Sequence, residues 1–334
     1  MKPLYTVVAG AALTLAVTAW YAAVQNDAEE ATMRVAFFPN IAHAVPVVGM
    51  ETGSFERNIG NITRLEVRLF DSGPQAIEAL FSGSIDMAYV GPGPAINGFL
   101  KSTDRDIRIL AGAASGGSSM VAHTDSGIAL AEDLRGKRVA APQISNTQDI
   151  SLRNYLAENG MAPAERGGSV TVLNIANPDT YTLFAKGELD AAWVPEPWAT
   201  MLVNELDGQR LFREEEMWPD GRFASVVLVA RGQFVEENPT VVSKWLEVHH
   251  SMIEWINDNP RDARDSFNRY VESELGRPFP DDIIDESMSN ILFTADPLKE
   301  SIETFALRAD GLGYLGRDGY DLNGLYMETH DGDA

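Results

Sequence analysis

The chain has 334 residues, of which 45% are hydrophobic, a formal net charge of −23 and no cysteine. This length and apolar content predict about two globular domains with buried cores. The composition excludes nucleic-acid binding, which needs a basic face, and it excludes disulfides, thiolate catalysis and cysteine-ligated metals.

Residues 1–32 are predicted to form a signal peptide or an N-terminal membrane anchor. Lys2 precedes an uncharged stretch at 3–24, and acidic residues follow at Asp27 and Glu29. This charge order directs the rest of the chain out of the cytoplasm. The stretch is about long enough to span a bilayer, which favours an uncleaved anchor, and cleavage near Ala23 is the alternative.

Residues 33–122 are predicted to form the first part of a lobe of alternating strands and helices. Apolar runs indicate strands at 33–38, 64–70, 85–90 and 108–113. Helices are expected between them, at 43–53, at 74–83 and after residue 91. Pro74 suits a first helical turn and Gly83 suits a helix end. This β-α-β order predicts a parallel sheet with right-handed crossovers.

Residues 123–222 are predicted to form a second lobe with the same plan. Strands are expected at 137–141, 170–175 and 189–194, and helices at 147–159, at 178–186 and from residue 197. The connections between the lobes are expected at 119–125 and 219–224. Residues 223–334 supply a return strand at 225–230 and helices that pack on the first lobe, at 239–257, 261–271, 281–290 and 298–308.

An internal repeat supports two similar lobes. Residues 34–95 align without a gap on 138–199, an offset of 138 − 34 = 104 residues. The match is clearest where 83–90 falls on 187–194. A repeat of this length corresponds to a whole lobe, and the cleft between two facing lobes is a common place for small molecules to bind.

Polar and glycine-rich loops follow the strands at the ends where open parallel sheets bind ligands. The candidate residues are Asn40 and His43 after the first strand, Gly91 and Pro92 after the third, Ser118 after the fourth, and, at matching places in the second lobe, Asn146, Thr147, Gln148, Glu196 and Trp198. All but one of these loops lead into helices, whose free N–H groups hold anions without Arg or Lys, and none of the loops contains either. Ordinary helix capping by Asn146 or Thr147 is the alternative interpretation of any single loop.

Three side chains near these loops have two interpretations each. His43 either donates a hydrogen bond to an anion or caps a helix. Trp193, at a strand end of the second lobe, either walls the ligand or packs in the core, and Glu196 either faces a cationic group or caps the next helix.

No metal-ligand spacing, hydrolase nucleophile motif or phosphate-binding loop occurs in the sequence. The sequence therefore predicts no metal, no cofactor and no catalysis.

Four motifs carry a resemblance to a known family. They are 38–44, with Phe38, Asn40 and His43; 83–91; 146–149, with Asn146, Thr147 and Gln148; and 190–198, with Trp193, Glu196 and Trp198. Together they resemble the nitrate/sulfonate/taurine-type solute-binding proteins of ABC importers, over about residues 33 to 315. The resemblance implies the type II periplasmic-binding-protein fold, in which two similar α/β lobes close on a ligand and C-terminal helices cover the first lobe. It implies ligand loops at Asn40, 91–92, Ser118, 146–148 and 196–198.

The resemblance also implies an extracytoplasmic, monomeric protein that delivers a small solute to a membrane permease driven by a cytoplasmic ATPase. An aliphatic sulfonate or taurine is the first expectation, and nitrate, bicarbonate or a thiamine-precursor pyrimidine are the alternatives. An enzyme of the pyrimidine-synthase branch is disfavoured, because that branch is expected to be cytosolic and to use iron and cysteine, which this chain lacks. A sensor that docks on a separate membrane partner stays open. The chain also lacks the cysteine of the family's lipoprotein form.

Overall fold

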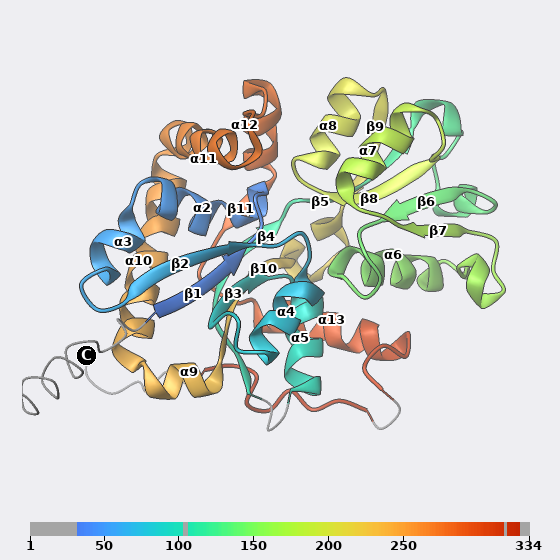
Figure 1. Cartoon of the computed structure of the whole chain (residues 1–334). Coiled ribbons are helices and arrows are strands. Elements are labelled where there is room, and N and C mark those ends of the chain that lie inside the picture. The colour runs from blue at the N-terminus through green and yellow to red at the C-terminus, as the bar shows by residue number, and fades with distance from the viewer. Residues whose placement is uncertain (1–31, 103–105, 317–318, 328–334) are drawn as a thin grey trace, which may run out of the picture.

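The computed structural model describes residues 32–102, 106–316 and 319–327, which form two α/β lobes (Figure 1). Each lobe is built around one sheet. The predicted targeting segment lies outside the described residues except for Thr32, which begins the first strand. Within the described part of the chain, no helix is long and apolar enough to cross a membrane.

The first sheet has six strands in the order β11-β4-β10-β3-β1-β2. They are β1 (Thr32–Phe37), β2 (Arg64–Leu69), β3 (Met87–Val90), β4 (Ile107–Gly116), β10 (Ala224–Arg231) and β11 (Ile291–Phe293). Strand β1 pairs in parallel with β2 and β3, whereas β10 lies antiparallel between β3 and β4. The sheet is therefore mixed rather than wholly parallel, because β10 returns from the second lobe and enters from the opposite end.

The second sheet has five strands in the order β7-β6-β8-β5-β9. They are β5 (Ser118–His123), β6 (Arg138–Ala141), β7 (Thr171–Asn174), β8 (Ala191–Pro195) and β9 (Gly208–Arg213). Strands β6, β7 and β8 are parallel, and β5 is antiparallel to both β8 and β9. A connection between the lobes was expected at 119–125, but residues 119–123 instead belong to β5 of the second sheet.

The chain passes from the first sheet to the second at two glycines. Gly116 and Gly117 have φ values of 79° and 78°, in the left-handed region that glycine adopts at little cost. The chain returns from β9 to β10 through two short 3₁₀ helices, η6 (Glu214–Met217) and η7 (Pro219–Gly221). The first connection thus lies earlier than expected, and the return lies close to the expected segment at 219–224.

The helices cover both faces of the two sheets. Those that follow the strands of the first sheet are η1 (Ile41–His43), α2 (Ala44–Glu51), α3 (Ser54–Ile59), α4 (Gly73–Phe81), α5 (Pro92–Lys101), α9 (Gly232–Glu237), α10 (Pro239–Asp258), α11 (Pro260–Leu275), α12 (Asp281–Ser289) and α13 (Lys299–Gly311). Those of the second lobe are η3 (Thr124–Ser126), η4 (Ala131–Leu134), α6 (Thr147–Glu158), η5 (Ala164–Arg166), α7 (Asn177–Ala185) and α8 (Trp198–Glu205). The C-terminal helices α10 and α11 pack on α2, as expected for the first lobe.

Strand alternation gives the first sheet an apolar core on each face. Val35 and Phe37 of β1 are fully buried on one face, with α2, α3 and α10. Ala36, between them, is fully buried on the other face, with α4, α5 and α13. Successive side chains of a strand point to opposite faces, so a sheet that is covered on both faces has apolar residues at consecutive positions.

Both lobes contain the same polar contact, which confirms that they are similar. The backbone N–H of Arg34 donates to Asp86 Oδ2 over 2.8 Å in the first lobe. The backbone N–H of Arg138 donates to Asp190 Oδ2 over 2.7 Å in the second. In each case the aspartate precedes the strand that pairs in parallel with the arginine's strand. The repeated residues therefore tie equivalent strands together in the two sheets.

Candidate functional site

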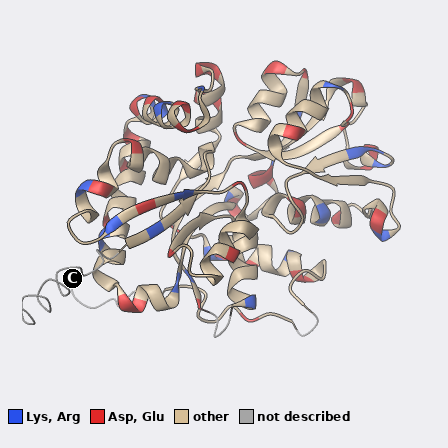
Figure 2. Cartoon of the chain, in the orientation of Figure 1, with Lys and Arg blue, Asp and Glu red and all other residues tan. Residues whose placement is uncertain are grey.

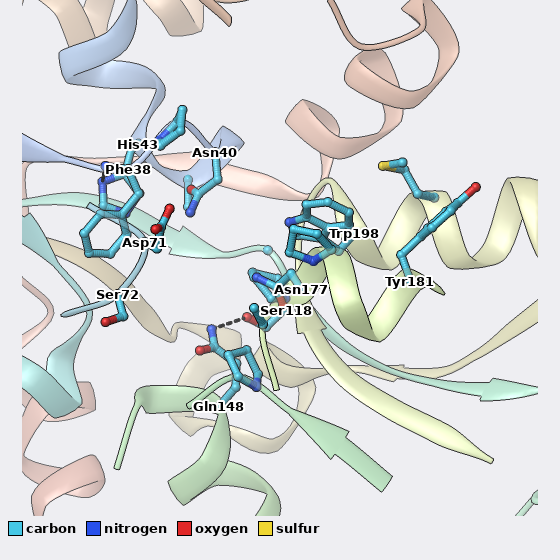
Figure 3. Close-up of a pocket in the computed structure, with 18 of the residues that line it drawn as sticks. Phe38, Asn40, His43, Asp71, Ser72, Ser118, Gln148, Asn177, Tyr181 and Trp198 are labelled. Carbon is cyan, nitrogen blue, oxygen red and sulfur yellow. Dashed lines mark hydrogen bonds between the residues drawn. The ribbon is translucent and has the colours of Figure 1, made fainter. Parts of the chain in front are cut away.

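A cavity of about 1010 Å³ lies between the lobes, and both lobes line it (Figure 3). Its walls come from the loops that follow β1, β2 and β3 and from those that follow β6, β7 and β8. These are the carboxyl ends of parallel strands, where the sequence placed the candidate ligand residues. Eight of those candidates line the cavity: Asn40, His43, Gly91, Ser118, Asn146, Thr147, Gln148 and Trp198.

Several helices begin at the cavity without a capping bond from the residue that precedes them. Ser72 precedes α4, Gly91 precedes α5 and Asn146 precedes α6, and none of these three residues makes a side-chain capping bond. All three residues line the cavity. The capping interpretation of Asn146 therefore finds no support in its side-chain contacts. The free N–H groups and helix dipoles give the cavity wall partial positive charge.

Four buried polar atoms of the lining lack a hydrogen-bond partner among the described residues. They are Asn40 Oδ1, Ser72 Oγ, Asn177 Oδ1 and Ser225 Oγ. Most buried polar atoms in folded proteins are hydrogen-bonded, since an unpaired one costs about 1–3 kcal/mol. Polar atoms that stay unpaired around one cavity are suited to a polar ligand.

Gln148 and Ser118 form a hydrogen bond at the cavity wall, which Figure 3 shows as a dashed line. Gln148 Nε2 donates to Ser118 Oγ over 3.1 Å. Ser118 begins β5, directly after the glycines of the first crossing, and Gln148 lies in the first turn of α6. The contact joins the crossing segment to the helix start that faces the cavity.

His43 lines the cavity as a neutral imidazole. Burial lowers its pKa to about 3, because the charged form loses its hydration there. Its Nδ1 accepts a hydrogen bond from the backbone N–H of Phe38 over 3.4 Å, which leaves the proton on Nε2. The two rings pack with their centroids 4.5 Å apart. His43 thus offers an N–H group and no positive charge.

Trp193 packs in the core of the second lobe and does not line the cavity. Its side chain is fully buried, and Nε1 donates to Glu214 Oε2 over 2.7 Å. Burial raises the pKa of Glu214 to about 7. The core interpretation of Trp193 agrees with this position.

Glu196 and Pro92 also lie outside the lining. Glu196 is fully buried, and its Oε1 accepts from Arg210 Nη1 over 3.0 Å and from Asn290 Nδ2 over 2.8 Å. Its Oε2 accepts from the backbone N–H of Thr200 over 2.9 Å, within the first turn of α8. Glu196 therefore caps a helix and joins the second lobe to the end of α12. Pro92 occupies the first turn of α5.

The loops that follow the second strand of each lobe also line the cavity and were not predicted from the sequence. Asp71 and Ser72 follow β2, and Asn177 and Tyr181 belong to the turn and helix after β7. The rule that ligands bind beyond strand carboxyl ends applies to these loops as well. The segment 277–280 between α11 and α12 completes the wall, and the repeat gives no signal for it because it lies outside the repeated residues.

The cavity wall carries few charges. Asp71, Glu205 and Arg277 are its side chains that are charged at neutral pH. Elsewhere, acidic and basic side chains are spread over the outer helices of both lobes (Figure 2). In the described ranges, no three histidine or carboxylate side chains are grouped so that they could hold a metal ion.

A sequence profile of the NMT1-like family matches residues 26–270, which is most of the chain. The chain belongs to the NMT1-like family. Among curated proteins, the taurine-binding periplasmic protein of Escherichia coli K12 is 31% identical to this NMT1-like chain over 175 residues, 52% of each protein. The matches to the first curated relatives span 52% to 62% of those proteins' lengths.

Solved structures of binding proteins share the fold. The alkanesulfonate-binding protein SsuA of Xanthomonas axonopodis pv. citri, bound to MOPS, superposes with a TM-score of 0.71 at 20% identity, covering 86% of this chain and 93% of that one. The periplasmic nitrate-binding protein NrtA of Synechocystis PCC 6803 has a TM-score of 0.71 at 18% identity, covering 87% of this chain and 83% of its own. The expected periplasmic-binding-protein fold is confirmed.

Proposed function

We propose that this chain is the extracytoplasmic solute-binding component of an ABC importer. It captures a small anionic solute between its lobes and delivers the solute to a membrane permease with a cytoplasmic ATPase. The observation that carries the proposal is the cavity between the lobes, where the starts of several helices meet unpaired polar side chains. The names of the relatives favour a binding role over catalysis and an aliphatic sulfonate or taurine as the solute.

The proposed ligand contacts are the eight predicted residues that line the cavity, together with Ser72 and Asn177. Backbone N–H groups at the starts of α5 and α6 would hold the anionic group without a lysine or arginine. Trp198, half-buried at the wall, provides an apolar surface for the organic part.

The proposed mechanism is closure of the two lobes about the crossing segments. We propose Gly117 and the segment 214–223 as the boundaries between the moving units, in place of boundaries near 122 and 222. A ligand that contacts both lobes stabilises the closed state more than the open one. A contact between the lobes already exists, because the backbone N–H of Gly93 in α5 approaches Thr147 Oγ1 in α6 to 3.4 Å.

Calorimetric titration of the purified protein tests the function. Taurine and short alkanesulfonates are expected to bind at one site per chain, and sulfate and nitrate are expected to bind weakly or not at all. Ligand that binds the folded state alone also raises the melting temperature, by mass action. Binding of nitrate without binding of any sulfonate would contradict the proposed substrate class, and binding of none of them would contradict the proposed function.

A further inference from the structure

The loop that leads into α6 contains a tight turn at the cavity wall. The backbone N–H of Asn146 donates to the carbonyl oxygen of Gln143 over 3.0 Å, which closes a turn of four residues. Both of these residues line the cavity. Ser145, the third residue of the turn, has a φ of 64°, whereas the φ of Ile144 is not positive. This combination is the pattern of a type II turn.

Serine is an unfavourable residue at that place in the turn. A type II turn requires a positive φ at its third residue, and glycine is the usual occupant because other residues adopt this region at a cost. Turning over the peptide between Ile144 and Ser145 would give a type I turn, in which serine has an ordinary negative φ. The turn could therefore relax unless a contact holds this peptide in place. Strained residues that are held by their surroundings occur often at binding sites.

Asp149 supplies that contact. Its Oδ2 accepts a hydrogen bond from the backbone N–H of Ser145 over 2.9 Å. The N–H and C=O groups of one peptide point in opposite directions, so the alternative turn would direct the carbonyl oxygen of Ile144 towards the same carboxylate. Two acceptors would then face each other, and the hydrogen bond would be lost. The carboxylate of Asp149 therefore selects the turn that the structure shows.

The other oxygen of Asp149 belongs to a buried network that compensates its charge. Oδ1 accepts from Arg153 Nε over 2.7 Å and from Asn174 Nδ2 over 2.8 Å. Asp149 is fully buried, and Arg153 is nearly so. The ion pair explains how a carboxylate can lie in the first turn of α6, close to the proposed place of an anionic group. Asp149 can thus act on the turn as an acceptor without repelling the solute.

A purely structural role for this aspartate is the alternative. The ion pair with Arg153 is buried within the second lobe, and an acidic residue in a first helical turn also interacts favourably with the helix dipole. Neither role requires a hydrogen bond to Ser145. In the repeat, moreover, Asp149 falls on Val45, since 149 − 104 = 45, and the first lobe forms its equivalent helix without a carboxylate there. The scaffold that the two lobes share therefore does not depend on it.

We propose that Asp149 is a positioning residue of the solute site, and that it holds the turn 143–146 in the conformation that binds. This inference rests on the proposed function. The turn sets where Gln143 and Asn146 lie in the cavity wall, and it sets how the chain enters α6, whose first N–H groups are proposed donors to the anion. Asp149 does not line the cavity itself. It acts on the solute through the backbone of Ser145.

The test is a double-mutant cycle on Asp149 and Ser145, with taurine and ethanesulfonate as probes in calorimetric titration. Asp149→Asn replaces an acceptor by an amide, which can donate to the carbonyl oxygen of Ile144 and so favours the alternative turn. This variant is expected to weaken binding of the better probe by on the order of tenfold or more. Adding Ser145→Gly is expected to recover most of the lost affinity, because glycine adopts positive φ without a contact to hold it.

Thermal unfolding of the same proteins separates positioning from stability. Asp149→Asn is expected to lower the melting temperature with or without Ser145→Gly, because Arg153 has lost the charge of its partner in both proteins. Affinity that recovers while the melting temperature stays low is a result that a structural role would not give. The matched control is Asp179→Asn, because Asp179 is an exposed acidic residue in the first turn of α7 that does not line the cavity. It should keep the wild-type affinity.

Ser145→Val leaves the side chain of Asp149 in place and covers the case in which Asp149→Asn does not fold. A β-branched residue is disfavoured at positive φ more strongly than serine, so this variant should also weaken binding by on the order of tenfold. Affinities within about twofold of the wild type in Asp149→Asn or in Ser145→Val, or no recovery in the double variant, would overturn the assignment and leave the proposed function standing. Binding of neither probe to the wild-type protein would remove both.

Discussion

At the scale of single residues, some polar side chains near the cavity stabilise the fold, and others are free to bind a ligand. Asn146 illustrates the second group, because its side chain makes no capping bond to α6. Glu196 illustrates the first, since four donors surround its carboxylate and Arg210 neutralises it. A buried carboxylate with such partners belongs to the fold.

Asn146→Ala is expected to weaken solute binding by on the order of tenfold, through loss of a polar contact in the cavity. The melting temperature without solute should change little, because no cap is lost. Calorimetric titration of the variant measures the loss of affinity, and thermal unfolding of the same samples measures the melting temperature. Equal loss of stability and affinity would show that Asn146 acts as a cap instead.

His249 is the second residue with a measurable consequence, since it ties α10 to the first sheet. Trp245 Nε1 donates to the Tyr89 hydroxyl over 3.1 Å, and this hydroxyl lies 2.9 Å from His249 Nδ1. His249 Nε2 donates to the Gly112 carbonyl oxygen over 2.7 Å. Burial favours the neutral imidazole and lowers the pKa of His249 to about 4.

This lowered pKa predicts acid destabilisation. The unfolded state takes up a proton near pH 6.5, whereas the folded state resists until about pH 4. The stabilising contribution is therefore complete above pH 6.5 and is lost as the pH falls towards 4, by at most about 1.4 kcal/mol per pH unit. Urea unfolding at several pH values gives the free energy of unfolding. This free energy should depend less steeply on pH in His249→Gln than in the wild type. His123→Gln, in the second lobe, is the control, and identical slopes in all three proteins would contradict the assignment.

At residue scale, sequence reasoning found the loops but not the orientation of every side chain. The positions of Asn40, Asn146 and Gln148 follow from strand ends, which apolar patterns reveal. Whether Glu196 faces the cavity depends on Arg210 of β9 and on Asn290, which lies 94 residues further along the chain. A pairing of this kind forms only in three dimensions, so no local pattern could decide between the two interpretations.

At the scale of elements, the starts of α5 and α6 meet across the cavity. A Cβ atom at Gly91 would clash with Thr147 Oγ1, so the absence of a side chain allows this close approach. The segment 91–94 is therefore as important for lobe contact as for ligand contact.

Gly91→Ala is expected to hold the lobes apart and to weaken solute binding by on the order of tenfold. Thr147→Ala in the same chain should restore part of the lobe contact, because the clashing oxygen is removed. Gly311→Ala is the control, since an added Cβ there meets no atom within 4 Å. Small-angle scattering with solute measures the lobe separation, and a compact Gly91→Ala variant would contradict the steric argument.

Proline and glycine made several helix boundaries predictable. Proline lies in the first turn of α4, α5, α7 and α10, and glycine comes shortly after the ends of α4 and α7, since each residue type is suited to one end of a helix. Strand β5 was taken for a connection, because only three of its six residues are apolar and its partners β8 and β9 lie far along the chain. Strand β11 has three residues and is defined by pairing with β4 alone.

At the scale of the whole molecule, the lobes touch on two sides of the cavity. Helix α12 packs against α8, and α13 packs against α6. Both contacts join C-terminal helices to the second lobe (Figure 1). Contacts between these helices, outside the ligand site, would therefore also limit how the lobes move when they close on a solute.

The protein is expected to become more compact when solute binds. Saturating taurine should reduce the radius of gyration measured by small-angle scattering, because the ligand contacts both lobes and favours the closed state. A sulfonate that binds by calorimetry without any change in the radius of gyration would show that the lobes are already closed without ligand.

The antiparallel position of β10 has a consequence for how the chain folds. β10 lies in the interior of the first sheet, between β3 and β4, yet it begins 224 − 116 = 108 residues after β4 ends. Its central residues Val227, Leu228 and Val229 are fully buried, so the first lobe has no complete core until the second lobe has been synthesised. Pairing between such distant segments is slow. A late central strand delays folding, and such a delay would suit the export that the proposed extracytoplasmic role requires.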